Sequence, residues 1–122
     1  MVYILYIICR EEDAMLFISV EDFLTQASGI PRLSRDAEKD LAQRMISGDR
    51  NAREMLVRSQ LPLVAGYVRR APQKIRTLRT VYVCIAATEK SVDSFNFLQD
   101  SEAFVHHLNW RLRQCITGCL VD

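Results

Sequence analysis

The sequence predicts an all-α fold, a helical bundle built around a long amphipathic helical hairpin. Two observations favour it. Between Ser34 and Arg70, apolar residues recur every three or four positions, which is the period of one face of a helix. Gly48 and Asp49 interrupt this rhythm with a residue suited to ending one helix and a residue suited to capping the next. We therefore expect two consecutive helices joined at Gly48 and Asp49.

The first arm of the hairpin begins at Ser34, whose hydroxyl can cap the helix. Its apolar residues Leu41, Ala42, Met45 and Ile46 recur at helical spacing, so one face of this arm is apolar. The second arm continues the same rhythm to Ala71 and closes at Pro72. Pro62 lies inside this arm, where it removes one backbone hydrogen bond and should kink or split the helix near Gln60.

The remaining segments also favour helices. We expect a short helix from Ser19 to Gly29, a buried helix over 78–87 despite its β-branched residues, and a last helix from about Ser101 to Thr117 that Gly118 stops. A polar turn is expected before the last helix, over 96–101. The predicted common core consists of Met55, Leu56, Val64, Val68, Phe95, Phe104 and Leu108.

Composition indicates one domain of ordinary globular balance. The chain has 122 residues, of which 49% are hydrophobic and 25% charged, and this length suffices to bury a core without metal or disulfide staples. We assign residues 1–18 to an apolar N-terminal extension and 19–122 to a single helical domain. The apolar run over 2–9 suits a short strand or an apolar plug; it is far shorter than the roughly 20 residues that span a bilayer.

The cysteines and histidines point to a reduced protein without a metal. The cysteines lie at scattered spacings, without a C-x-x-C pair, so a cytoplasmic location is favoured over a disulfide framework. His106, His107, Cys115 and Cys119 carry zinc-ligand chemistry, but adjacent histidines point away from each other on a helix. No nucleophile–base constellation and no glycine-rich phosphate loop is present, so we expect neither an enzyme nor a cofactor.

Positive charge is concentrated in the middle of the chain, although the net charge is only +1. No acidic residue occurs between Glu54 and Glu89, whereas that interval holds Arg58, Arg69, Arg70, Lys74, Arg76 and Arg79. Such a patch suits a phosphate backbone or an acidic protein surface, and a solvated helix face and loop is the plainer alternative.

Three stretches carry a family resemblance. They are VEDFLTQASGIPRLSRDAEKDLAQRMISGDRNAREMLVRSQLPLVAGYVRR (20–70), KSVDSFN (90–96) and FVHHLNWRLRQCIT (104–117). In this order they resemble regions 1.2 to 2.4 of the bacterial RNA polymerase sigma factors of the sigma-70 family. The resemblance implies a sigma region 2-like helical bundle. It stops before regions 3 and 4, so we expect a truncated module that does not read a minus-thirty-five element.

The resemblance also implies a DNA-binding surface. The positions that match the family's promoter-facing residues are Phe104, His107, Trp110, Arg113, Gln114 and Thr117. In the family an aromatic wedge opens the duplex at the minus-ten element; here His107 stands at the place of a Tyr and Arg111 at that of a second Trp. The residues expected to hold the phosphates are Arg69, Arg70, Lys74 and Arg76.

The chain departs from the family in the polymerase-binding helix. Where the family shows a motif like D-L-I-Q-E-G, this sequence has Arg79, Thr80, Val81, Tyr82, Val83 and Cys84. We therefore predict weak association with the polymerase core. Two functions remain open. One is a transcription initiation module that binds melted, AT-rich promoter DNA of the minus-ten type. The other is a sigma-like interaction module or decoy that binds an anti-sigma factor or polymerase without reading promoters.

Overall fold

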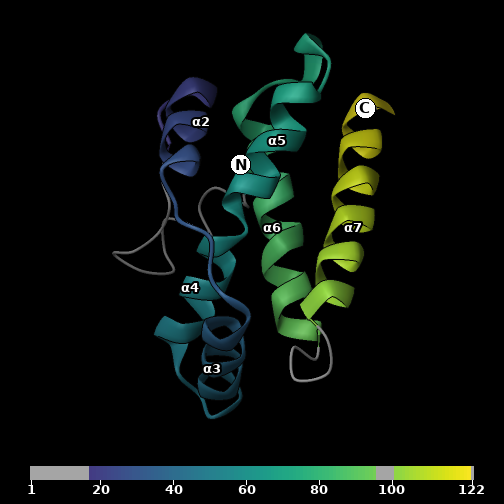
Figure 1. Cartoon of the computed structure of the whole chain (residues 1–122). Coiled ribbons are helices and arrows are strands. Elements are labelled where there is room, and N and C mark those ends of the chain that lie inside the picture. The colour runs from purple at the N-terminus through teal and green to yellow at the C-terminus, as the bar shows by residue number, and fades with distance from the viewer. Residues whose placement is uncertain (1–16, 96–100, 122) are drawn as a thin grey trace.

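The computed structural model describes residues 17–95 and 101–121, and within these ranges the regular structure is entirely helical (Figure 1). The helices are α2 (Val20–Ser28), α3 (Arg35–Ile46), α4 (Arg50–Ser59), α5 (Leu61–Arg70), the short 3-10 helix η1 (Gln73–Ile75), α6 (Leu78–Ser94) and α7 (Ser101–Val121). The predicted all-α fold is confirmed. The apolar run over 2–9 and most of the expected turn over 96–101 lie outside the described residues.

The hairpin is capped as its sequence predicts. The Ser34 hydroxyl accepts a hydrogen bond from the backbone N–H of Ala37 at 3.1 Å and begins α3. Gly48 follows that helix with φ of 99°, a backbone conformation that residues with a Cβ rarely adopt. The Asp49 carboxylate then accepts from the N–H of Ala52 at 3.2 Å and begins α4. Local capping chemistry therefore fixes the turn between the two arms.

Pro62 divides the second arm of the hairpin into two helices. α4 ends at Ser59, Gln60 occupies the junction, and α5 begins at Leu61 with Pro62 in its first turn. A proline is tolerated there because the N–H groups of a first turn have no partner within the helix. The predicted break near Gln60 is confirmed.

The segment before α2 is attached to the centre of the bundle. The Phe17 N–H donates to the Tyr82 hydroxyl at 3.0 Å, and the Phe17 ring meets that of Phe23 edge-on, with 5.0 Å between centroids. α2 itself begins at Ser19, whose hydroxyl accepts from the Asp22 N–H at 3.0 Å. α2 thus lies against α5 and α6 through specific contacts at its start.

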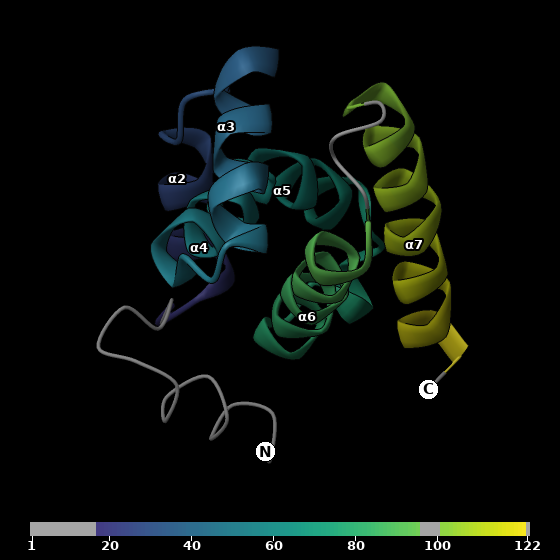
Figure 2. The same ribbon diagram turned by 90° about the horizontal axis from the view of Figure 1, so that it is seen from below.

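The core forms around α6, which packs against α2, α4, α5 and α7. Figure 2 shows α6 between α4 on one side and α7 on the other. The β-branched start of α6 does not prevent a helix, because its apolar side chains are buried on several sides by other helices. Side chains with almost no exposed surface include Phe23, Leu56, Val64, Val68, Val81, Ile85, Phe104, Leu108 and Leu112.

Two details of the prediction are wrong. Met55 is 51% exposed, whereas its neighbour Leu56 is fully buried; consecutive residues lie about 100° apart around a helix, so only one can face the core. Gly118 does not stop the last helix, which continues to Val121. Among the described glycines only Gly48 has a positive φ, so Gly118 keeps ordinary helical geometry at a modest cost in propensity.

One charged network joins the hairpin to α6. The Arg53 guanidinium donates to both carboxylate oxygens of Asp93, at 2.6 and 2.9 Å, and lies 3.9 Å from the buried Glu89. The hydrogen bond to Asp93 raises the pKa of Arg53. This bidentate pair holds α4 against the C-terminal half of α6. Within the described ranges, no helix combines the length and the apolar character needed to cross a membrane.

Candidate nucleic-acid interface

One face of α7 carries exposed side chains of the types that contact nucleic acid. Trp110, Arg113, Gln114 and Thr117 recur at the spacing that places residues on one side of a helix, and each of them is exposed. Trp110 presents 55% of its surface to solvent, unusually much for an indole. We call these four residues the α7 outer face. Their predicted common location on one surface is confirmed.

Phe104 does not belong to this face. Its side chain is fully buried with Leu108 and Leu112, and its ring packs against Phe95 with 5.3 Å between centroids. A side chain without exposed surface offers nothing on which a base can stack. Its predicted contact with DNA is therefore wrong in this structure, and the role of Phe104 is to hold α7 on α6.

His107 lies at the edge of the α7 outer face. Its ring stacks on that of Phe95, with 5.9 Å between centroids and 22° between the planes, and the residue is half-buried. It lies one turn before Trp110, so the two rings are neighbours along the helix. One face of the imidazole is covered by Phe95, and the half-buried residue keeps part of its surface exposed.

The residues predicted to contact phosphates lie at the end of α5 and in the following loop. All four are exposed, namely Arg69, Arg70, Lys74 and Arg76. Arg76 donates from Nη2 to the carbonyls of Arg69 and Ala71, at 3.1 and 2.8 Å, and so closes the end of α5. Arg69 donates to the Ser28 hydroxyl at 2.6 Å. We call these four residues the basic end.

A polar contact connects the basic end to α7. The Tyr67 hydroxyl donates to the side-chain carbonyl oxygen of Asn109 at 2.7 Å, and the Arg70 guanidinium lies over the Tyr67 ring, 5.1 Å from its centroid. Asn109 is one turn before Arg113 on α7. Figure 1 shows the loop after α5 and the C-terminal half of α7 at the same end of the bundle. The basic end and the C-terminal half of α7 therefore lie at the same end of the bundle.

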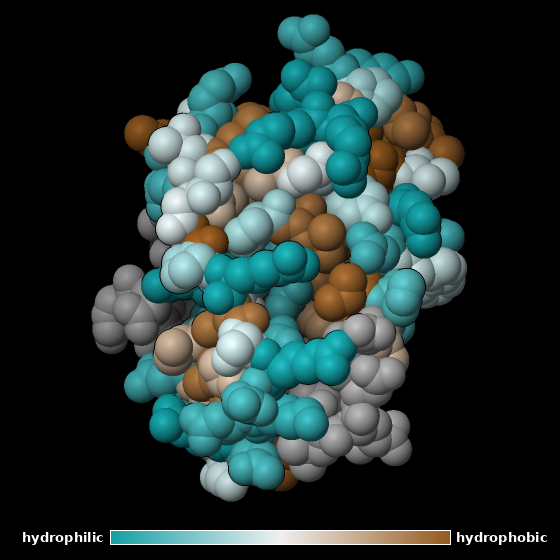
Figure 3. All heavy atoms as spheres, in the orientation of Figure 1, coloured by the Kyte–Doolittle hydropathy of each residue, from teal (hydrophilic) through white to brown (hydrophobic). Residues whose placement is uncertain are grey.

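A groove lies between the segment that precedes α3, the α4–α5 junction and the first half of α7. It encloses about 340 Å³ and is lined by Arg32, Leu33, Arg35, Glu38, Ser59, Gln60 and Val105. An adjoining hollow of about 400 Å³ adds Ile30, Pro62 and Leu63 to the lining. Figure 3 shows apolar surface near the middle of this side of the molecule, bordered by strongly hydrophilic groups.

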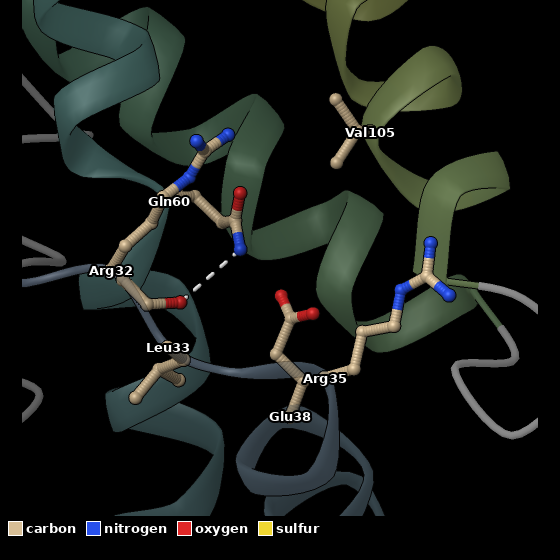
Figure 4. Close-up of a pocket in the computed structure, with 7 residues that line it drawn as sticks. Arg32, Leu33, Arg35, Glu38, Gln60 and Val105 are labelled. Carbon is tan, nitrogen blue, oxygen red and sulfur yellow. Dashed lines mark hydrogen bonds between the residues drawn. The ribbon is translucent and has the colours of Figure 1, made fainter.

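Polar groups of both signs converge on the groove. In Figure 4 the Gln60 amide nitrogen donates to the Arg32 carbonyl, shown as a dashed line, and the Glu38 carboxyl lies beside this amide. Val105 faces them from α7, and Arg32 and Arg35 flank the opening. Burial raises the pKa of the Glu38 carboxyl, while its hydrogen bond with Gln60 and the two arginines act in the opposite direction. Gln60 itself is only 8% exposed. Because the amide nitrogen also donates to the Ser59 hydroxyl at 3.2 Å, the groove offers a ligand chiefly acceptors, the Gln60 amide oxygen and the Glu38 carboxyl.

The groove was not predicted from the sequence. The available signals were the polar Gln60 at the proline-induced break and the two arginines that surround the predicted cap Ser34. Each of these polar residues indicates only that its own short segment is exposed. None indicates that α7, more than forty residues later, closes the groove with Val105.

The segment that replaces the family's polymerase-binding motif does not form a continuous surface. Arg79 is exposed and Val83 is half-buried, whereas Thr80, Val81, Tyr82 and Cys84 are buried in α6. The buried members of this set contact the core and cannot contact a protein partner in this structure. Their predicted place in a polymerase-binding surface is wrong for that reason.

Comparison with known proteins supports the relationship that the motifs indicate. The chain is 31% identical over 122 aligned residues to the RNA polymerase sigma factor SigA of Clostridium acetobutylicum. The alignment covers 93% of this chain and 32% of the relative, so the chain spans about a third of the length of that curated protein. No family model and no solved structure matches the chain. The similarity to SigA supports a relationship to the sigma-70 family.

Proposed function

We propose that this chain is a sigma-like transcription initiation module that binds melted, AT-rich promoter DNA of the minus-ten type in the cytoplasm. The observation that carries the proposal is the exposed Trp110 beside Arg113 and Gln114 on one face of α7. The similarity to SigA supports it, because that relative is an RNA polymerase sigma factor.

Trp110 supplies the stacking platform. Every base has an aromatic face, so an indole holds an unpaired base whatever its hydrogen-bonding edge. Gln114, one turn further along α7, has an amide that can donate to and accept from an adenine, and Arg113 adds a positive charge beside it. Melted DNA is favoured over closed duplex because its bases are already unstacked.

In this proposal the basic end holds the strand that reaches the α7 outer face. Arg69, Arg70, Lys74 and Arg76 are exposed, and the Tyr67–Asn109 hydrogen bond fixes α5 beside α7. Phosphate contacts supply affinity without sequence preference, whereas the α7 outer face supplies the contacts to bases.

The groove extends the proposed surface toward α3. Its volume of about 340 Å³ lies within the range of ligand pockets, roughly 300–1,000 Å³. The Gln60 amide oxygen and the Glu38 carboxyl can accept hydrogen bonds from the edge of one unstacked base, and Arg32 and Arg35 can contact its phosphates. We assign to the groove a second base of the same strand.

DNA binding tests the proposal. In fluorescence anisotropy, a bubble carrying an AT-rich minus-ten sequence should bind more tightly than the closed duplex or a scrambled bubble. If the four side chains of the basic end each contact a phosphate, the affinity should fall with salt at a logarithmic slope of about −3. Arg70→Ala should weaken binding to all sequences alike, whereas Lys39→Ala, an exposed cation on α3, serves as the matched control. Equal and negligible binding to every probe would contradict the proposal.

The second candidate function is an interaction module that binds an anti-sigma factor or polymerase without reading promoters. The segment at the position of the family's polymerase motif contains no acidic or amide residue. Most of it is also buried, namely Thr80, Val81, Tyr82 and Cys84. We therefore expect little or no capture by core polymerase in a pull-down. The double change Arg79→Asp and Val83→Gln, at the exposed and half-buried positions, should increase capture, whereas Lys39→Asp should not. Strong capture of the unmodified chain would place the polymerase contact elsewhere.

A further inference from the structure

α6 and α7 pack together, and each carries a cysteine at a matching position along the pair. The contact between the Phe95 and Phe104 rings, 5.3 Å apart, sets the register of these two helices at one end. Cys84 precedes Phe95 by eleven residues, and Cys115 follows Phe104 by eleven residues. Eleven residues make about three turns, so each cysteine returns to the same face as its phenylalanine and to the same height along the pair.

Packing independently places both thiols at this interface. Cys84 belongs to the buried core, and Cys115 packs against that core from α7. The residues on the α7-facing side of α6 are small, namely Cys84, Ala87, Thr88 and Ser91, and all are buried. Small side chains let two helices approach at the lower end of the usual 8–10 Å interaxial distance. We infer that the Cα atoms of Cys84 and Cys115 lie within the roughly 4.4–6.8 Å that a disulfide spans.

The two thiols differ in access to solvent and in acidity. Cys84 is fully buried, whereas Cys115 is half-buried. Burial raises the pKa of Cys84 to about 12, with further contributions from Cys115 and Cys119. Burial also raises the pKa of Cys115, but the Arg111 guanidinium acts in the opposite direction there. Cys115 is therefore the member of the pair that a small oxidant reaches, and Cys84 is the internal thiol.

We propose that Cys84 and Cys115 form a disulfide under peroxide and thereby clamp α7 to α6, as a redox-sensitive device built into the bundle. The Cys115 sulfur attacks one peroxide oxygen and the O–O bond breaks, so that a sulfenic acid forms and the departing hydroxide takes the Cys115 proton to give water. The Cys84 sulfur then attacks the Cys115 sulfur, the S–O bond breaks, and the hydroxide accepts the Cys84 proton. In sum, two thiols and one hydrogen peroxide give one disulfide and two waters.

The third thiol on this side of α7 is Cys119, one turn beyond Cys115. The register pairs it with Thr80 rather than with Cys84, and two cysteines four residues apart on one helix do not readily bridge without local unwinding. Among the described residues, no three side chains of His, Cys, Asp or Glu are placed to hold a metal ion. Disulfide formation is therefore the chemistry that we assign to these thiols.

The clamp should act on stability rather than on the proposed DNA surface. The disulfide closes a loop of about 30 residues, which should raise Tm by roughly 10 °C or more through lost freedom of the unfolded chain. Trp110 and Arg113 are exposed on α7, whereas Cys115 packs inward, so the α7 outer face remains accessible after oxidation. DNA affinity, if present, should change by less than about twofold, which separates this inference from the proposed function.

The test uses the full chain with Cys9 replaced by serine, oxidised under native conditions with hydrogen peroxide. Peptide mapping by mass spectrometry should find a Cys84–Cys115 linkage, and dithiothreitol should reverse both the linkage and the rise in Tm. Cys84→Ser and Cys115→Ser should each abolish the rise, whereas Cys119→Ser should retain it. A Cys84–Cys119 linkage would overturn the register. A folded, oxidised chain without an intramolecular linkage would overturn the proposal, and mapping of the parent chain decides this even if a serine variant folds poorly.

Discussion

Val64→Asp is expected to unfold the protein. Val64 lies in α5 with no exposed surface, within the same core as Leu56, Val68 and Phe104. An aspartate there would bury an uncompensated carboxylate, at a cost of several kcal/mol. The whole stability of a domain of this size is only about 5–15 kcal/mol, so most of it would be lost. Thermal unfolding followed by circular dichroism at 222 nm measures the effect.

Met55→Asp provides the matched control, because Met55 is a core position by sequence periodicity but is 51% exposed in the structure. Its substitution should change stability by less than about 1 kcal/mol, as for most surface positions. If the two variants lose stability equally, the assignment of the buried face of the second arm is wrong.

The helix ends of the hairpin could be predicted from the sequence, because each depends on residues that are neighbours in the chain. Ser34, Gly48 and Asp49 could be assigned from the sequence because a cap hydrogen bond joins residues three apart and a positive φ selects glycine. The break at Gln60 followed from the missing N–H of Pro62 for the same reason. In each case the residues that decide the geometry are neighbours in the chain.

Contacts between distant helices could not be predicted in this way. Phe104 has two predictions, a core position from helical periodicity and a DNA contact from its place in the motif. The Phe95 ring and the buried face of α7 decide for the core. The segment from Thr80 to Cys84 also has two predictions, a buried helix from its apolar run and a polymerase contact from its place in the motif. Thr80, Val81, Tyr82 and Cys84 are buried because α6 has neighbours on several sides. The groove forms because Val105 of α7 lies near Gln60, and no pattern among neighbouring residues in the sequence predicts this contact between distant segments.

Trp110→Ala is expected to have the largest effect on DNA binding of any change that leaves the fold intact. Removing one stacking aromatic costs roughly 1–3 kcal/mol, which corresponds to a loss of about 5- to 150-fold in affinity. Because Trp110 is 55% exposed, the substitution should leave thermal stability nearly unchanged. Trp110→Phe should retain part of the affinity, since a smaller aromatic ring still stacks.

The affinity of this variant pair for the AT-rich bubble is the measurement that tests the central claim most directly. Fluorescence anisotropy should give the order parent chain, Trp110→Phe, Trp110→Ala, with the difference much reduced on closed duplex, where no unpaired base is offered to the indole. Equal affinities of all three proteins for the bubble, at unchanged Tm, would contradict the account that the α7 outer face binds melted DNA.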